Sequence, residues 1–168
     1  MITIYLDMDG VLADFHKAYY DDVPRDKQWN RARFRTMVME HKIFEGLEML
    51  PNAVHLLETV ERYRSTHAVK VEILSSKGTY DGEQGLETAR QKEYWLEKHG
   101  ILYPANFVRS KIEKAKFAHG RAILIDDSEG CIIPFNDAGG HGILHTDQFH
   151  HETLETLYLK VDEIHAKL

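Results

Sequence analysis

The chain has 168 residues, which suits one domain with at most a small insertion and leaves enough core to fold without disulfides or a structural metal. Its 21 lysines and arginines against 27 aspartates and glutamates give a formal charge of −6, which disfavours general attraction to nucleic acid or an anionic membrane. Cys131 has no second cysteine to pair with, and no apolar run approaches the ~20 residues of a membrane span, so we expect a soluble cytoplasmic protein.

The chain opens with a predicted strand. Ile2 to Leu6 is short, apolar and rich in β-branched residues, and it ends at Asp7. It lacks the basic region of a signal peptide, so we expect these residues to belong to the fold. The next stretch contains no strand candidate and carries several arginines among aromatic and aliphatic residues. We interpret residues 14–48 as a small helical cap inserted after the first strand.

The middle of the chain alternates helix and strand patterns. After Pro51, apolar residues recur at helical spacing, and a second predicted strand, residues 69–74, ends at Ser75. A further helical pattern spans residues 86–99, before Gly100 as a plausible C-terminal stop.

The last third repeats this alternation. Residues 122–125 form a third strong strand candidate, residues 106–108 and 142–144 are weaker ones, and residues 151–168 have a helical apolar face. Together the elements predict an α/β fold, a Rossmann-like doubly wound parallel sheet. The core would comprise residues 1–13 and 49–168, with ligands bound beyond the carboxyl ends of the strands.

Polar residues follow three of the predicted strands, at the edge where ligands would bind. They are Asp7 and Asp9, Ser75 and Ser76, and the pair Asp126 and Asp127. Several carboxylates at one edge repel one another unless a cation lies between them, and hard oxygen ligands suit Mg²⁺. The sequence therefore predicts a magnesium site there.

These motifs resemble a known superfamily. Asp7-Met8-Asp9-Gly10-Val11, Ser75, a downstream lysine and Asp126-Asp127 are similar to the four ordered motifs of the haloacid dehalogenase-like hydrolases, most of which are phosphatases. The run from Asp7 to Phe15 and the segment around Ile43-Phe44 resemble the 5′(3′)-deoxyribonucleotidases more closely. Receiver domains also gather acids around Mg²⁺, but their acid pair lies on the first strand, and here it comes late.

The resemblance implies roles for the acids. Asp7 would attack phosphorus and form an aspartyl phosphate, while Asp9 would protonate the leaving oxygen and later accept a proton from water. Mg²⁺ would be held by Asp7, by the backbone carbonyl of Asp9 and by Asp127, with Asp126 beside it. Which member of the last pair touches the metal stays open.

The resemblance also implies phosphate and substrate contacts. Ser75, Ser76 and the following loop would bind phosphate oxygens, and Lys111 is the preferred lysine, with Lys114 as an alternative and Lys116 as a weaker one. Substrate would be bound by Phe15, Phe44 and Lys92, the two aromatic rings stacking on a base. For both rings, packing within the cap is an alternative explanation.

The expected function is Mg²⁺-dependent hydrolysis of a small phosphate ester, a deoxynucleoside monophosphate in the leading interpretation. A phosphatase of polynucleotide 3′ or 5′ ends, or of another small phosphate ester, is the alternative. No membrane partner is expected, and the sequence does not specify the base, the sugar or the oligomeric state.

Overall fold

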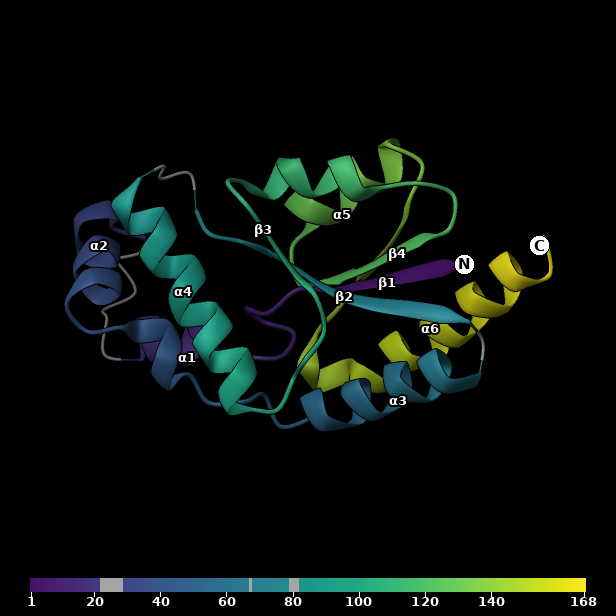
Figure 1. Ribbon diagram of the computed structural model, residues 1–168, viewed down its shortest axis with the longest axis horizontal. Helices are drawn as coiled ribbons and strands as arrows, with labels where there is room; N and C mark the ends of the chain where they lie inside the picture. Colours follow the sequence, from purple (N-terminus) through teal and green to yellow (C-terminus); the bar gives the residue numbers. More distant parts are fainter. Residues whose placement is uncertain (22–28, 67, 79–81) are drawn as a thin grey trace.

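The computed structural model describes residues 1–21, 29–66, 68–78 and 82–168, so residues 22–28 of the predicted insertion lie outside it. Its centre is a five-stranded parallel sheet in the order β3-β2-β1-β4-β5 (Figure 1). The strands are β1 (Ile2–Leu6), β2 (Val69–Ser76), β3 (Ala105–Val108), β4 (Ala122–Asp126) and β5 (His141–Leu144). The predicted α/β class and parallel sheet are confirmed, including both weak strand candidates.

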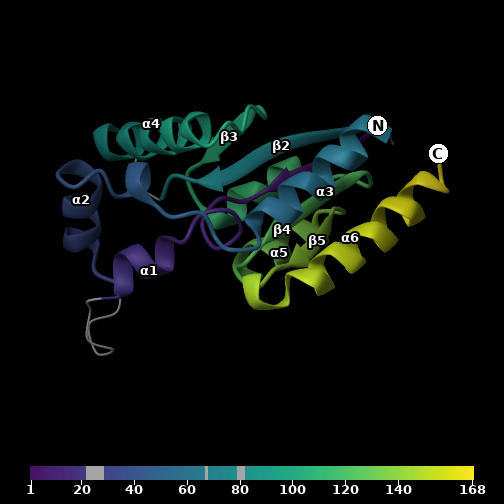
Figure 2. The same cartoon turned by 90° about the horizontal axis from the view of Figure 1, so that it is seen from below.

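Helices cover both faces of the sheet. On one face lie α3 (Ala53–Thr66) and α6 (His150–His165), and on the other lie α5 (Glu129–Asp137) and the 3₁₀ segment η2 (Lys111–Phe117) (Figures 1 and 2). A short 3₁₀ turn, η3 (Asp147–Phe149), leads into α6. None of the helices within the described residues has the length and apolar character of a membrane span.

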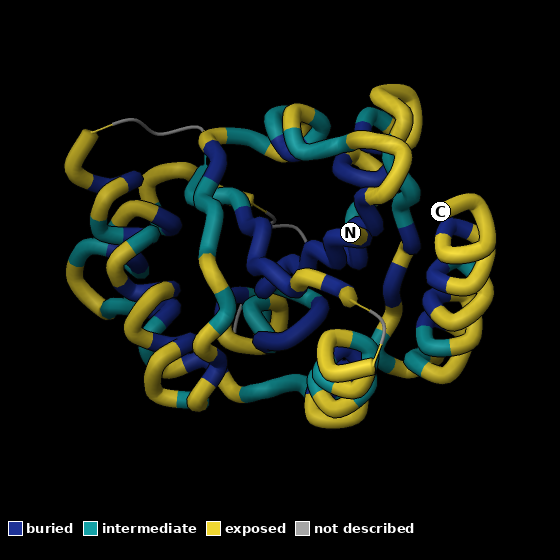
Figure 3. Tube along the Cα trace, turned by 45° about the vertical axis from the view of Figure 1, so that its right-hand side comes forward, coloured by how far each residue is buried: buried dark blue, intermediate teal, exposed yellow. Residues whose placement is uncertain are grey.

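Alternation along the strands explains this two-sided cover. Ile4 and Leu6 belong to the larger apolar cluster, whereas Tyr5 between them belongs to the smaller one, which also contains Phe135 of α5. Successive strand side chains point to opposite faces, so every residue of β1 is buried. Figure 3 shows this buried centre with exposed residues concentrated on the outer sides of the helices.

The remaining helices gather beyond the carboxyl ends of the strands. They are α1 (Phe15–Tyr20), α2 (Arg31–Met39), the 3₁₀ segment η1 (Ile43–Gly46) and α4 (Glu83–Lys98). Figure 2 shows α1, α2 and α4 on the side toward which β2 points. The first three occupy the predicted insertion, whereas α4 comes from the part of the chain that the sequence assigned to the core, and it packs against α2 and η1.

Trp95 joins α4 to the end of the insertion. Its side chain is fully buried, and its indole Nε1 donates a hydrogen bond of 2.8 Å to the carbonyl oxygen of Leu47. A buried indole needs such an acceptor, and a buried carbonyl needs such a donor. This contact therefore fixes where α4 lies relative to residues 43–47.

Replacing Trp95 by phenylalanine should lower the free energy of unfolding by about 1–3 kcal/mol, because the buried carbonyl of Leu47 loses its donor. Urea unfolding should show a lower midpoint with an unchanged slope. Tyr94→Phe on the exposed side of the same helix is the matched control and should stay within about 0.5 kcal/mol of the parent. Equal stability of the Trp95→Phe variant and the parent would contradict the assigned role.

Candidate active site

Acidic side chains from neighbouring strands meet at one edge of the sheet. Asp7 directly follows β1, while Asp126 ends β4 and Asp127 comes next. Leu6 pairs with Ile125 in the parallel register, and the backbone N–H of Asp7 donates to the Ile125 carbonyl at 3.0 Å. The two strands therefore end at the same level, which brings acids distant in sequence side by side.

Asp7, Asp126 and Asp127 form a carboxylate cluster, each offering an oxygen within 4.8 Å of the others. Asp7 and Asp126 are buried, whereas Asp127 is exposed to solvent. Partial desolvation of its carboxyl group, together with the charges of Asp7 and Asp126, raises the pKa of Asp127 to about 7. Burial and the charge of Asp7 likewise raise the pKa of Asp126.

The cluster fits a hard divalent cation. All of its donors are carboxylate oxygens, the ligand type that suits Mg²⁺. Asp126 already accepts hydrogen bonds on both oxygens, from the Lys114 ammonium at 2.6 Å and from the backbone N–H of Ser128 at 3.0 Å. Asp7 and Asp127 are therefore better placed than Asp126 to touch a metal directly.

Gly10 makes room for Asp127. Its φ of +78° lies in the left-handed region, which favours glycine. A Cβ at this position would lie 2.0 Å from Oδ2 of Asp127, which is far inside van der Waals contact. The turn after β1 is closed by the Met8 carbonyl, which accepts the backbone N–H groups of Leu12 and Ala13 at 2.8 and 2.9 Å.

Two lysines on η2 take different positions. Lys114 is buried, and its ammonium lies 2.9 Å from Oδ1 of Asp7 and 2.6 Å from Oδ2 of Asp126. Although burial opposes it, the charges of these two acids raise the pKa of Lys114. The preferred candidate Lys111 instead lies at the exposed rim, where its ammonium donates to Oγ of Ser128 at 3.0 Å. The lysine beside Asp7 is therefore Lys114.

Asp9 pairs with Lys92, a fully buried lysine of α4. Oδ2 of Asp9 lies 2.8 Å from the Lys92 ammonium, and Oδ1 is buried without a hydrogen-bond partner in the described residues. Burial raises the pKa of Asp9 and the charge of Asp7 adds to the rise, against the opposing charge of Lys92. The environment thus favours the protonated form of Asp9 more than water does.

The structure places Lys92 and Ser75 away from the surface that a substrate would touch. Lys92 also donates to Oγ of Ser75 at 2.9 Å and to the carbonyl of Ser76 at 2.8 Å, so its three N–H groups are all used within the protein. Ser75 is fully buried. Ser76 and Gly78, by contrast, line the cavity above the acids.

That cavity has a volume of about 1120 Å³ and extends from the acids to aromatic rings of the cap. We call the rings that line it the aromatic wall: Phe15, Tyr20, Trp29 and Phe34. The predicted Phe15 is part of this wall. The predicted Phe44 lies behind it. Its ring is stacked on that of Phe15, with 5.4 Å between the ring centroids and 12° between the ring planes, and only 3% of the residue is exposed.

Most of the wall is absent from the residues that the sequence singled out. Tyr20, Trp29 and Phe34 lie in the insertion without any motif spacing, and only the high density of aromatic residues there could have pointed to them. Gly130 of α5 and Ser128 before it also line the cavity, because α5 begins directly after the acid pair.

Comparison with models of known protein families found no match, and comparison with curated protein sequences found none either. Solved structures do match. A structure described as a dehalogenase has a TM-score of 0.54 at 11% identity, over 86% of this chain and 84% of its own. A HAD-superfamily hydrolase from Ehrlichia chaffeensis has a TM-score of 0.53 at 11% identity, and the match covers 95% of this chain and 97% of the hydrolase. The chain therefore has the haloacid dehalogenase-like fold, in which its acids lie at the carboxyl edge of a Rossmann-like sheet.

Proposed function

We propose that the protein is a Mg²⁺-dependent phosphomonoesterase that hydrolyses deoxynucleoside monophosphates through an aspartyl phosphate. The observation that carries the proposal is the buried Asp7, which lies in a cluster with Asp126 and Asp127 and contacts the Lys114 ammonium at 2.9 Å. Phosphate-ester chemistry needs a nucleophile beside groups that offset the charge of the phosphate. This edge of the sheet supplies both.

Asp7 performs the first step. Its carboxylate oxygen attacks phosphorus and forms a new P–O bond as the ester P–O bond breaks, leaving the phosphoryl group on Asp7. Lys114 holds Asp7 in place through Oδ1 and balances its charge. A second, water-driven displacement at phosphorus releases inorganic phosphate and restores the carboxylate.

Asp9 moves the protons. In the first step it gives its proton to the departing alkoxide oxygen, and in the second it accepts one from the attacking water. Burial favours its protonated form, as the first step requires. Lys92 holds Oδ2 of Asp9 at 2.8 Å, and Oδ1, which has no hydrogen-bond partner in the described residues, is the oxygen that would carry the proton.

Asp7 and Asp127, with Asp126 behind them, are the residues that would hold Mg²⁺. Bound there, the ion supplies positive charge toward the phosphate oxygens. On the protein side, Ser76, the backbone around Gly78 and the rim lysine Lys111 face the cavity and would bind the same oxygens.

The aromatic wall supports the nucleotide assignment. Flat bases stack on aromatic faces with about 1–3 kcal/mol per base, independently of base identity. Phe15 and the other rings of the wall line the same cavity as Asp7, so a base held there would lie against aromatic side chains. The resemblance of residues 7–15 to the 5′(3′)-deoxyribonucleotidases supports the same substrate class.

A polynucleotide end is the second candidate substrate. The cavity is larger than the roughly 300–1000 Å³ typical of small-molecule sites, and Arg31 and Lys111 place positive charge along its lining. Phosphate release from deoxynucleoside monophosphates, compared with 5′- and 3′-phosphorylated oligonucleotides, separates the two candidates. Dehalogenation is less favoured, because a carbon–halogen bond brings no anionic oxygens to a cation that Asp7 and Asp127 would hold.

Asp7→Asn should lower kcat by about 10³-fold or more, because the amide is a far poorer nucleophile of nearly the same volume. Phosphate release from a panel of phosphate esters measures the loss, and circular dichroism checks that the fold is retained. Turnover by a folded Asp7→Asn variant at the parental rate would refute the mechanism.

Lys114→Met and Lys111→Met should have unequal effects. Loss of Lys114 leaves Asp7 beside uncompensated buried charge, so we expect kcat to fall by about 10²-fold or more and the folded state to lose stability. Loss of the exposed Lys111 should change kcat/KM by less than about tenfold. Assays well below the melting temperature of each variant separate activity from stability, and the opposite ranking would assign the site lysine to Lys111.

Removal of divalent cations should abolish turnover, and Mg²⁺ should restore it, because the three acids repel one another and the substrate without a cation. Dialysis against EDTA followed by Mg²⁺ titration measures this effect. Asp127→Asn should raise the Mg²⁺ concentration required for half-maximal activity. Full activity in excess EDTA would exclude the metal site.

A further inference from the structure

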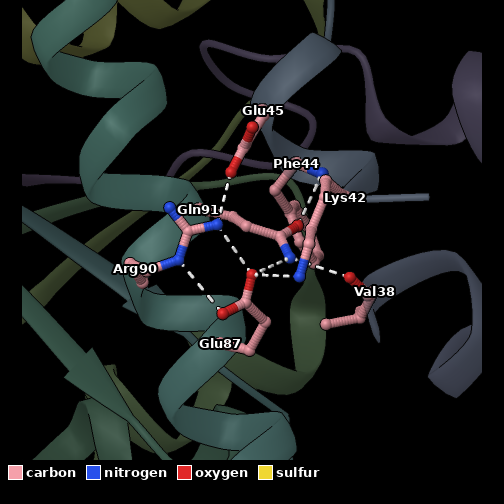
Figure 4. A network of polar contacts seen from close by, with 7 residues as sticks. All are labelled: Val38, Lys42, Phe44, Glu45, Glu87, Arg90 and Gln91. Atoms are coloured by element: carbon pink, nitrogen blue, oxygen red, sulfur yellow. Dashed lines mark hydrogen bonds and ion pairs between the residues drawn. The ribbon is translucent and has the colours of Figure 1, made fainter. Parts of the chain in front are cut away.

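One buried amide, that of Gln91 on α4, joins two separate segments of the cap. Its Nε2 donates to the carbonyl oxygen of Val38 at 2.8 Å and to Oε1 of Glu87 at 2.8 Å, while its Oε1 accepts the backbone N–H of Phe44 at 3.3 Å (Figure 4). The residue is fully buried. Both of its N–H groups and its oxygen are therefore used, which makes three of the four hydrogen bonds possible for an amide side chain.

These bonds fix the place of Phe44. Val38 lies near the end of α2 and Phe44 lies in η1, so Gln91 spans the connection between the two elements. Glu87, one turn earlier on α4, adds ion pairs to Lys42 and Arg90, and Arg90 reaches Glu45 (Figure 4). Lys42 and Glu45, which precede and follow Phe44 in the sequence, are thus both paired with residues of α4.

Phe44 in turn supports the aromatic wall. Its ring stacks on Phe15 at 5.4 Å and meets the edge of Phe34 at 6.2 Å, and both of those rings line the cavity. Phe44 itself is buried and does not line the cavity. A shift of η1 would therefore displace Phe44 and, through it, Phe15 and Phe34 of the aromatic wall.

The next residue of α4, Lys92, contacts Asp9, which lies at the acidic end of the cavity. The Lys92 ammonium lies 4.8 Å from the centre of the Phe44 ring and 2.8 Å from Asp9. Consecutive residues of one helix thus hold the wall and the proposed acid.

We infer that Gln91 is a positioning residue for substrate specificity. It holds Phe44 in place, and Phe44 keeps the aromatic wall where it can contact a flat ring carried by the phosphate ester. The inference rests on the proposed phosphatase activity and deepens it. Gln91 touches neither substrate nor reacting atoms. Its loss affects esters that carry a flat ring and spares those that do not.

The test compares two substrates on one enzyme preparation: a deoxynucleoside 5′-monophosphate and 2-deoxyribose 5-phosphate, which lacks the base. The ratio of their kcat/KM values does not depend on the folded fraction, so a general loss of structure leaves it unchanged. In Gln91→Met this ratio should fall about tenfold, mainly through KM of the nucleotide, because base stacking weakens while the phosphate contacts remain.

Arg35→Met is the matched control. Arg35 also links α2 to α4, through Oε1 of Gln84 at 3.4 Å, but it does not contact Phe44, so the ratio should stay at the parental value. If Gln91→Met does not fold, Gln91→Glu, which keeps the acceptor and loses the donors, and Phe44→Leu, which shortens the support, should each lower the same ratio.

The outcomes separate the inference from the activity on which it rests. A parent that releases phosphate from neither substrate overturns both. A parent that hydrolyses both substrates with a ratio near one keeps the phosphatase and overturns the inference. A parental preference for the nucleotide that survives unchanged in a folded Gln91 variant, or in Phe44→Leu, overturns the inference alone.

Discussion

The repulsion among three carboxylates at one sheet edge is the constraint on which the site depends. Asp7 and Asp126 are buried at the ends of adjacent strands, where the unfavourable energy of two like charges is large. Lys114 lies between them and offsets part of that energy, but Asp127 adds a third acid beside the cavity. The folded state tolerates this arrangement because Lys114 is itself enclosed and because a cation can enter from the open side. A site with uncompensated negative charge on its open side attracts a cation and, through that cation, an anionic ester.

The cap and the core share one apolar cluster, so the aromatic wall and the acids are not independently placed. Phe34 and Phe44 of the insertion belong to the same buried cluster as Leu6 and Ile73 of the sheet. Helix α4 extends this continuity, since Trp95 bonds to Leu47 while Lys92 bonds to Asp9. A substrate that bridges the cavity therefore meets two surfaces whose separation is built into the packing. Under the proposed function, that separation would contribute to substrate choice together with the identity of the lining residues.

The sheet was predictable because its central strands are short, mainly apolar and end at polar residues. The patterns at residues 2–6 and 122–125 locate both the strands and the acids at their ends, and a parallel sheet brings such ends together. The choice between Lys111 and Lys114 was not predictable. The two lysines lie three residues apart on a 3₁₀ segment, where such residues share a face, so sequence spacing cannot separate the buried one from the rim one. The contacts of α4 with the cap were likewise not predictable, because polar residues such as Gln91 and Lys92 share its buried face with Trp95 and Leu96 and no continuous apolar stripe marks that face.

Local positive charge on η2 explains how an acidic protein could bind an anionic substrate. A formal charge of −6 repels phosphate esters at long range, but at physiological ionic strength charges are screened beyond about 8 Å. Within that distance the local arrangement decides, and Lys114 and Lys111 approach the cavity while Lys92 stays committed to Asp9. Lys92 therefore holds the acid without adding charge to the phosphate end. The charge of Lys92 opposes the rise in the pKa of Asp9, and the burial of Asp9 outweighs that opposition.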